Sequence, residues 1–360
     1  MREFSYQALP GRVVFGAGTA RTQLAEELRR VPAHRVLLVV SAAKRSLATE
    51  LTAPISELIA ATYPGVRPHV PLEVAEEARA LAAENGADAV LSIGGGSTTG
   101  TAKAVALTTG LPVIAVPTSY AGSEVTPVWG LTEADRKTTG VDLAVLPRSV
   151  IYDPELTVTL PARLSAVSGF NALAHCVEAF WAPGRNPISN LLAEEGLAAL
   201  VQGLPDVVDD GTDLAARSDV LYGAYLAGTA FAVAGSGLHH KICHVLGGAF
   251  GLPHADTHAV VLPYVLAFNQ DHATAAAARV ARAVGDDDPA RGLRRLADRL
   301  GVPRGLQQLG LRREQVPEAV RLIREVVPAD NPRPVRDRDL ERLLRAAWAG
   351  RSTDESEWLA

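Results

Sequence analysis

Short apolar runs alternate with longer segments of mixed polarity over the first half of the chain. Four of the runs have the length of a strand: residues 35–40 (RVLLVV), 87–93 (ADAVLSI), 111–116 (LPVIAV) and 150–152 (VIY). Segments of helical length separate them. Because strands that alternate with helices are typical of βαβ units, the sequence predicts an α/β fold with a parallel sheet.

The pattern changes after about residue 161. Alanine, leucine and arginine then recur at helical spacing, for example over residues 275–284 and 290–300, and strand-like alternation is absent. We therefore expect two domains: a Rossmann-like dinucleotide-binding α/β domain over residues 1–160 and an all-helical domain over residues 161–360. A length of 360 residues agrees with two domains of ordinary size.

One uncharged stretch, residues 220–238, is long enough to span a bilayer. It is rich in Gly, Ala and Thr, and His239-His240-Lys241 follows it at once. These features favour a helix buried in a soluble helical domain over a membrane span.

A glycine-rich loop ends the second predicted strand, where residues 92–100 read SIGGGSTTG. Glycines let the backbone approach a phosphate closely, and the free N–H groups at the start of the next helix bind the anion. A tight turn without a ligand is the alternative. The loop matches neither the GxGxxG nor the Walker pattern, so it indicates a diphosphate without identifying it. Candidate cofactor-binding residues are Gly94, Gly95, Gly96 and Ser97.

A second polar loop, residues 117–124 (PTSYAGSE), follows the third predicted strand. Ligands of open α/β sheets bind at the carboxyl ends of the strands, which is where this loop falls. The hydroxyls of Thr118, Ser119 and Ser123 can bond a ribose, a phosphate or a nicotinamide amide. An ordinary polar turn is the alternative reading.

Six of the nine histidines lie between residues 175 and 258. Asn171 and His175 are four residues apart, and His240 and His244 repeat that spacing, so each pair shares a helix face. His254 follows shortly afterwards. Isolated histidines are usually surface or core residues, but two such pairs beside a third site predict an active-site cluster. The remaining histidines, His34, His69 and His272, are expected to be structural.

Together these segments resemble the iron-containing alcohol dehydrogenases. The resemblance is carried by GGGS, PTSYAGSE, GFNALAH (169–175) and HHKICHVLGGAFGLPHADTHAVVLP (239–263), and it extends from residues 13–18 to residues 331–334. It implies a dehydroquinate synthase-like fold, with a dinucleotide-binding α/β domain followed by a helical domain. It also implies NADH or NADPH as cofactor, an active site in the cleft between the domains, and a homodimer. Lys137 matches a cofactor-contacting lysine of that superfamily.

Members of the superfamily bind a divalent metal through one aspartate and three histidines. The matching positions here hold Asn171, His175, His240 and His254. A neutral amide oxygen replaces a carboxylate poorly as a ligand of a hard or borderline cation. We therefore expect no bound metal, with these three histidines as residual candidates.

Asn171 also indicates a branch within the superfamily. Gly100 indicates the same branch, because many relatives carry aspartate there. Three further segments also resemble maleylacetate reductases: GLHHKICH (237–244), PRSVIYDPEL (147–156) and NPRP (331–334). Members of that branch reduce a carbon–carbon double bond. The resemblance implies hydride transfer to the alkene carbon beta to the ketone of maleylacetate. Protonation of the enolate then gives 3-oxoadipate, a step of aromatic-compound degradation.

Without a metal, side-chain donors must stabilise charge on the ketone oxygen. The candidates are His175, His240, Lys241, His244 and His254. Imidazoles suit a dianionic substrate because a bound carboxylate favours their cationic form.

The cofactor preference is open between NADH and NADPH. Ser41 follows the first predicted strand, where NAD-specific relatives often carry aspartate, and Lys44 and Arg45 lie nearby. This arrangement permits NADPH as well as NADH.

The net charge limits the kinds of molecule that the protein can bind, and the cysteine content indicates its compartment. The formal charge of −5, from 35 basic and 40 acidic residues, argues against nucleic acid or an anionic membrane and leaves a small dicarboxylate substrate. Two cysteines make no disulfide framework and indicate a reducing compartment. The first residues, MREFS, do not resemble a signal peptide, so we expect a cytoplasmic protein.

Three alternatives remain open. A metal-dependent alcohol dehydrogenase would contain stoichiometric metal. A biosynthetic reductase of another unsaturated keto acid would differ in a few pocket side chains. A catalytically silent binding protein would fail to bind either nicotinamide cofactor.

Overall fold

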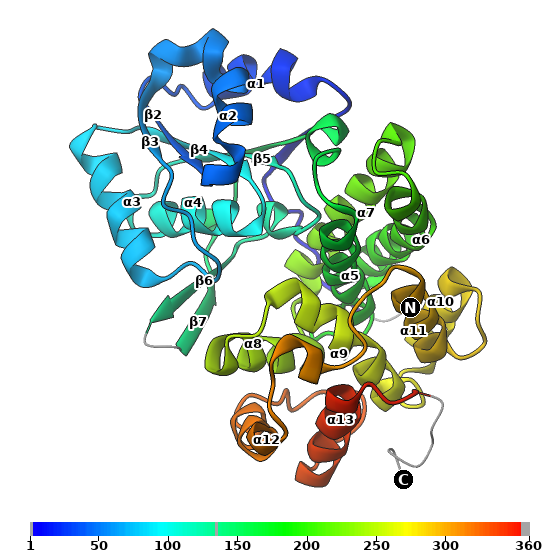
Figure 1. Cartoon of the computed structure of the whole chain (residues 1–360). Helices are drawn as coiled ribbons and strands as arrows, with labels where there is room; N and C mark the ends of the chain where they lie inside the picture. Colours follow the sequence, from blue (N-terminus) through cyan, green and yellow to red (C-terminus); the bar gives the residue numbers. More distant parts are fainter. Residues whose placement is uncertain (1–2, 134–135, 354–360) are drawn as a thin grey trace. The chain divides into compact units, whose positions relative to one another are not determined.

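The computed structural model describes residues 3–133 and 136–353 of the chain (Figure 1). These residues form two compact units. The α/β unit comprises Ala8–Leu160 and Thr212–Leu221, and the helical unit comprises the described parts of residues 1–7, 161–211 and 222–360. Because Thr212–Leu221 comes from the second half of the chain, the predicted domains 1–160 and 161–360 stay a prediction.

A six-stranded parallel sheet forms the centre of the α/β unit, with strand order β1-β8-β5-β4-β2-β3. The strands are β1 (Arg12–Phe15), β2 (Val36–Val40), β3 (Ile59–Tyr63), β4 (Ala89–Gly94), β5 (Val113–Pro117) and β8 (Ser149–Tyr152). The predicted α/β fold with a parallel sheet is confirmed. The four predicted strands are the inner strands, which are buried along their whole length.

Helices cover both faces of this sheet. Along β2, Val36, Leu38 and Val40 pack into a core with α1 (Thr19–Arg30) and α2 (Arg45–Thr52). The alternate residues Leu37 and Val39 pack with α3 (Leu72–Glu84) and α4 (Gly96–Thr109). Side chains of a strand point alternately to the two faces, so an unbroken apolar run fits a strand covered on both sides.

The sheet has a switch point between β2 and β4. From β2 the chain passes outward to the edge strand β3, and then returns to pair β4 with the other side of β2. In open α/β sheets ligands bind at the carboxyl ends of the strands at such a point. The glycine loop leaves the carboxyl end of β4 and therefore lies at the expected place.

A two-stranded antiparallel hairpin, β6 (Val128–Glu133) and β7 (Arg136–Val141), completes the α/β unit. The sequence patterns did not predict the hairpin or the edge strands β1 and β3. Most of their residues are half-buried or exposed, and their apolar runs are only two or three residues long, such as VVF in β1 and IAA in β3.

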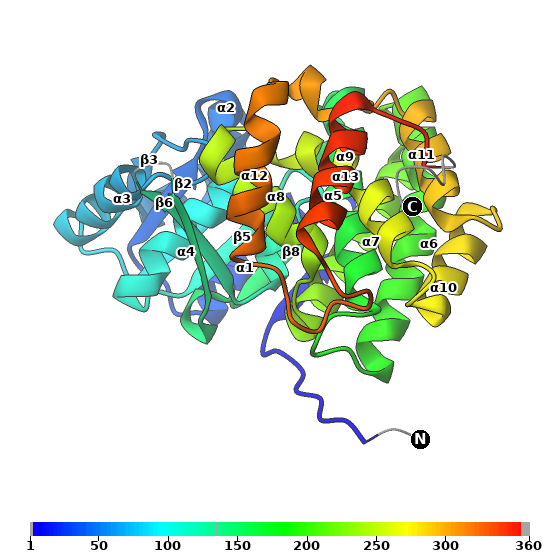
Figure 2. The same ribbon diagram turned by 90° about the horizontal axis from the view of Figure 1, so that it is seen from below.

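The helical unit is built around two almost fully buried helices, α5 (Ala162–Ala179) and α9 (His254–Asn269), which pack against each other. Figure 2 shows α12 and α13 side by side, and these two helices also pack together. The other helices are α6 (Pro187–Asp209), α7 (Leu214–Ala234), α8 (Leu238–Phe250), α10 (Thr274–Val284), α11 (Pro289–Arg299), α12 (Val316–Arg324) and α13 (Asp337–Ala349). The expectation of a helical second half is confirmed.

The uncharged stretch 220–238 is not one continuous helix. Helix α7 ends at Ala234, and Gly235 follows with φ of 84°, a left-handed conformation that ends helices. In the described part of the chain, no single helix is long and apolar enough to cross a membrane. Helices α7 and α8 reach that length and composition only together, as a pair bent by 101°.

Candidate active site

The glycine loop is a close-packed start of helix α4. Gly95 caps the helix, and Gly94 adopts φ of 158°. A Cβ atom on Gly94 would lie 2.4 Å from Thr98 Oγ1, and one on Gly96 would lie 3.0 Å from Ala121 Cβ. The loop therefore has room for backbone only, which is what close approach of a phosphate to a helix N-terminus requires.

The second loop lies directly against the first. A Cβ on Gly95 would be 3.1 Å from Ser119 Oγ, and the Thr118 N–H donates to the Gly94 carbonyl at 3.0 Å. Thr118 is buried, whereas Ser119 and Ser123 are half-buried. All the candidate cofactor residues of the two loops, Gly94 to Ser97, Thr118, Ser119 and Ser123, thus come together in the α/β unit.

A buried lysine holds the second loop in place, and sequence reasoning missed it. Lys103 of α4 donates from Nζ to the Ser123 carbonyl at 2.7 Å and to Thr126 Oγ1 at 3.1 Å. Burial lowers the pKa of Lys103 to about 7, against the attraction of Glu124. Glu124 is itself buried and accepts a hydrogen bond from the Tyr152 hydroxyl at 2.7 Å.

Lys137 lies on strand β7, and its side chain is outside the described residues. Its contact with a cofactor stays a prediction.

Helices α5, α8 and α9 of the helical unit bring six histidines together. The ring centroids of His175 and His240 are 5.1 Å apart and the rings are stacked. His244 stacks on His254 at 6.3 Å. His258 joins the two pairs, at 4.9 Å from His240 and 4.4 Å from His254. The predicted cluster of His175, His240, His244 and His254 therefore assembles, with His239 and His258 behind it.

Burial divides the cluster into an inner and an outer part. His175, His239, His240 and His258 are buried, whereas His244 and His254 are half-buried. Burial, reinforced by neighbouring imidazoles, holds the pKa of His175 and of His258 well below the usual value. Burial also lowers the pKa of His239 to about 3, against the attraction of Glu178. The lowered pKa values of His175, His239 and His258 keep these three rings neutral near pH 7, so the cationic form is not their resting state.

Lys241 lies on α8 immediately after His240 and is half-buried. Successive residues of a helix point about 100° apart, so Lys241 and His240 leave different faces of α8. A direct role for Lys241 beside the His240 ring stays a prediction.

Two side chains that complete the cluster carried no sequence signal. Phe231 of α7 packs on both the His175 and the His240 rings, with centroids at 4.6 and 4.8 Å. Glu178 of α5 accepts a hydrogen bond from His240 Nδ1 at 2.6 Å and is fully buried. Burial alone would raise the pKa of Glu178, but hydrogen bonds from His240 and from the Gly237 N–H keep that pKa below its usual value.

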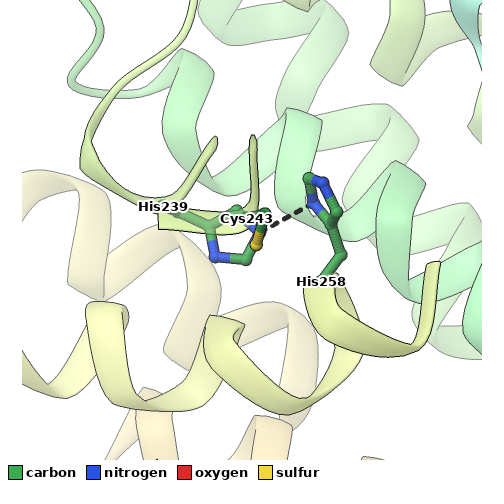
Figure 3. Close-up of side chains that lie close together, drawn as sticks. All are labelled: His239, Cys243 and His258. Carbon is green, nitrogen blue, oxygen red and sulfur yellow. Dashed lines mark hydrogen bonds between the residues drawn. The ribbon is translucent and has the colours of Figure 1, made fainter. Parts of the chain in front are cut away.

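His239, Cys243 and His258 form a second, fully buried group (Figure 3). His239 Nε2 and His258 Nδ1 are 2.9 Å apart, and Cys243 Sγ is 3.7 Å from His239 Nε2. Burial raises the pKa of the Cys243 thiol well above its usual value, as does the charge of Glu178. The three side chains offer two imidazole nitrogens and a sulfur, a set that could hold a metal ion once the thiol is deprotonated.

The positions that match the family's metal ligands carry one amide and three imidazoles, Asn171, His175, His240 and His254. Among the described residues, the three donor atoms of histidine, cysteine or acidic side chains found within 4.8 Å of one another belong to His239, Cys243 and His258. His175, His240 and His254 are not part of that group. Asn171, one turn before His175, supplies a neutral amide where the family has a carboxylate. Asn171 therefore leaves this donor set without the carboxylate of the family's ligand set, and the absence of a bound metal stays a prediction.

Comparison with known proteins places these features in a family. Residues 10–154 match the model described as iron-containing alcohol dehydrogenase, and residues 165–348 match the C-terminal model of the Fe-containing alcohol dehydrogenase family. The chain is 45% identical to maleylacetate reductase of Burkholderia cepacia over 97% of this chain and 99% of that protein.

Two solved structures are similar over nearly the whole chain. An iron-containing alcohol dehydrogenase from Corynebacterium glutamicum is 50% identical with a TM-score of 0.94, covering 98% of this chain and 99% of that one. Maleylacetate reductase from Agrobacterium tumefaciens is 42% identical with a TM-score of 0.92, with the same coverage of both chains.

Proposed function

The chain belongs to the iron-containing alcohol dehydrogenase family, and on that premise we propose that it reduces maleylacetate to 3-oxoadipate with a nicotinamide cofactor. The observation that carries the proposal is the histidine cluster with Asn171 at the family's aspartate position. Such a cluster offers many hydrogen-bond donors and no anionic metal ligand. The cluster suits a reaction in which an oxyanion must be stabilised. The similarity of the chain to maleylacetate reductases extends over nearly its full length.

The cofactor binds, in this proposal, to the two loops of the α/β unit. The N-terminus of α4 at Gly96 and Ser97 receives the diphosphate, with Gly94 and Gly95 allowing its approach. Thr118, Ser119 and Ser123 bind the ribose or the nicotinamide amide, and Lys137 contacts the cofactor from β7. The position after β2 holds Ser41, which has no charge to repel a 2′-phosphate, so both NADH and NADPH are accepted.

The chemistry is a conjugate reduction. Hydride passes from the reduced nicotinamide to the alkene carbon beta to the ketone, and the electrons of the double bond move onto the ketone oxygen. The resulting enolate takes one proton on the carbon alpha to the ketone. One NAD(P)H and one proton are consumed, and NAD(P)⁺ and 3-oxoadipate are formed. The barrier depends on donors placed around the ketone oxygen, each of which contributes roughly 10²–10³-fold.

The histidines divide this work according to their burial. His175 is buried and supplies a hydrogen bond to the developing oxyanion as a neutral imidazole. His240 is buried beside it and contacts the substrate through its ring. His244 and His254 are half-buried, which gives them access to protons from water. Lys241 attracts a substrate carboxylate. No divalent metal is required, because Asn171 removes the anionic ligand that the family uses.

The same proposal includes a cytoplasmic homodimer that acts on a small dicarboxylate rather than on nucleic acid or membranes. Both cysteines, Cys176 and Cys243, are free and buried, as expected in a reducing compartment. The net charge of −5 supports a small-molecule partner.

The test is a spectrophotometric assay of purified, chelator-treated protein with maleylacetate and either NADH or NADPH. We expect rapid cofactor oxidation that the chelator does not change. Oxidation only after zinc or iron is added would contradict the metal-free mechanism. Cofactor binding without turnover would overturn the assignment to maleylacetate and indicate another unsaturated keto acid. Failure to bind either cofactor would indicate a protein without this activity.

A further inference from the structure

Glu178 is a buried carboxylate that accepts four hydrogen bonds at one point of the helical unit. Its Oε1 accepts from the His239 N–H at 2.6 Å. Its Oε2 accepts from the N–H groups of Gly237 at 2.8 Å and His240 at 3.3 Å, and from His240 Nδ1 at 2.6 Å. One carboxylate therefore binds both the start of α8 and the ring of His240.

The three backbone bonds make Glu178 the cap of helix α8. The first N–H groups of a helix have no partners within it, and they carry the positive end of the helix dipole. Gly237 is the N-cap residue of α8 and makes no side-chain cap of its own. A Cβ atom on Gly237 would lie 2.7 Å from Glu178 Oε1, so only glycine lets the carboxylate approach so closely.

The fourth bond determines which nitrogen of His240 carries the proton. An ionised carboxylate only accepts hydrogen bonds, so the neutral His240 ring is protonated on Nδ1. Nε2 is then directed away from Glu178, and it is buried without a hydrogen-bond partner among the described residues. The rings of His175 and Phe231 pack against His240 and restrict its rotation.

We infer that Glu178 is the positioning residue of this active site, which caps helix α8 and orients His240 so that Nε2 faces the reacting atoms of the substrate. This role rests on the proposed reduction, in which His240 contacts the substrate. Glu178 acts only through His240 and through the helix that carries it.

The first variant is Glu178→Gln. An amide has one oxygen and one NH₂ group, so it cannot accept all four bonds and must release either the helix cap or His240 Nδ1. An NH₂ group facing His240 Nδ1 reverses the tautomer. We expect kcat to fall roughly 10–10³-fold, the range seen when an orienting partner of a reactive histidine is lost. The KM for NADH should change by less than about threefold, because the cofactor loops belong to the α/β unit.

Glu27→Gln is the matched control. Glu27 is equally buried in the α/β unit, where it accepts hydrogen bonds from Arg12 Nε at 3.0 Å and from the Ser149 hydroxyl at 2.6 Å. Its loss should lower the thermal midpoint and leave kcat unchanged. If Glu27→Gln reduced kcat as much as Glu178→Gln, general destabilisation would explain both results and the inference would fail.

A double-mutant cycle with His240→Ala tests whether Glu178 acts through His240. In the His240→Ala background, Glu178→Gln should lower kcat by less than about threefold further. Two independent losses that multiply would overturn the inference, as would full kcat in a folded Glu178→Gln variant.

A measurement on the substrate-free protein separates this inference from the proposed function. The ¹⁵N chemical shifts of the His240 ring, assigned by their loss in His240→Ala, report which nitrogen carries the proton. We expect Nδ1–H in the natural chain and a change of tautomer in Glu178→Gln. If that variant does not fold, Gly237→Ala displaces the carboxylate instead and should give the same spectral change. Nε2–H in the natural chain would overturn the inference even if maleylacetate is reduced.

Discussion

At the scale of the residue, a single amide, Asn171, distinguishes the histidine cluster from the ligand set of the family. Asn171 lies on α5 one turn before His175 and is buried with it. The other family ligand positions carry imidazoles, of which His175 is neutral because burial lowers its pKa. The cluster therefore contains donors and acceptors for hydrogen bonds but no anionic ligand at the family's ligand positions, which is why we propose oxyanion stabilisation without a metal.

Asn171→Asp should convert the cluster toward metal binding. A carboxylate at this position restores the one-acid, three-histidine set and should raise zinc affinity by at least about tenfold, because charged oxygen ligands neutralise the cation. The measurement is metal content by mass spectrometry after dialysis against dilute zinc. Asn171→Leu is the control and should bind no more zinc than the natural chain. Equal zinc content in all three proteins would show that geometry, not charge, excludes the metal.

Gly94→Ala tests the glycine loop. A Cβ at this position would lie 2.4 Å from Thr98 Oγ1, in the first turn of the helix that we propose receives the diphosphate. Displacing that turn should raise the Kd for NADH at least about tenfold, or roughly 1.4 kcal/mol. Gly110 at the other end of α4 has φ of 69° and open space around it. Gly110→Ala should therefore cost about 1 kcal/mol of stability and leave the Kd, measured by NADH fluorescence, unchanged.

Residues of the site could be predicted from the sequence only where polar residues recur at helical spacing. The pairs Asn171/His175 and His240/His244 share helical spacing, so a helix pattern predicts that each pair lies on one face. Glu178 and Phe231 have no such repeat. Their roles depend on contacts with α8 from elements far away in the sequence, and such contacts leave no local pattern.

At the scale of the element, helix α4 connects the glycine loop to the second loop, residues 117–124. Its first turn follows Gly94, and seven residues after Gly96 the helix presents Lys103 to the carbonyl of Ser123. The two loops are thus held at a fixed spacing by one helix. This arrangement buries Lys103 in surroundings that disfavour its charged form, which destabilises the folded state below the ordinary pKa of lysine.

This destabilisation makes stability depend on pH. Burial lowers the pKa of Lys103 from 10.5 to about 7, so over this interval the unfolded chain holds a proton that the folded chain does not. The contribution of Lys103 to the free energy of unfolding therefore increases with pH between about 7 and 10.5, by up to about 1.4 kcal/mol per pH unit. This contribution to stability is lost as the pH falls toward 7. Lys103→Met removes the titrating group. The thermal midpoint of this variant minus that of the natural chain should therefore be larger near pH 7 than at higher pH.

The control for this prediction is Thr126→Val, which removes one partner of Lys103 and keeps the titrating group. Its thermal midpoint should follow the same pH trend as the natural chain. Curves for Lys103→Met and the natural chain that run parallel over about pH 7 to 10 would contradict a lowered pKa of Lys103.

The elements themselves were predictable where burial is two-sided. Strands β2, β4, β5 and β8 lie inside the sheet and are buried along their whole length, whereas β1 and β3 at its edges are half-buried or exposed at most positions. The break after Ala234 was missed because Gly235 lies within an apolar stretch that looks continuous. Only the left-handed conformation of that glycine reveals the end of the helix.

At the scale of the whole molecule, helix α7 belongs to both compact units. Its residues up to Leu221 lie in the α/β unit and those from Tyr222 onward in the helical unit. Arg217, in the first part, is fully buried. It donates to the Tyr120 hydroxyl at 2.9 Å and to the Leu160 carbonyl at 3.0 Å. Tyr120 lies in the second loop, residues 117–124, which we propose binds the cofactor. Arg217 therefore connects the start of α7 to this loop and to Leu160 at the end of the α/β segment.

Arg217→Leu should therefore destabilise the protein strongly. The substitution removes the donor of the half-buried Leu160 carbonyl and of the buried Tyr120 hydroxyl, and leaving such a group unsatisfied costs about 1–3 kcal/mol. We expect a thermal midpoint several degrees lower. Arg299→Leu is the control, because Arg299 and its partner Asp209 are both exposed and such a pair contributes at most about 1 kcal/mol. Because Arg217 also holds Tyr120, the surviving folded protein should bind NADH more weakly, whereas Arg299→Leu should not. Equal midpoints for the two variants would show that the start of α7 does not depend on its buried arginine.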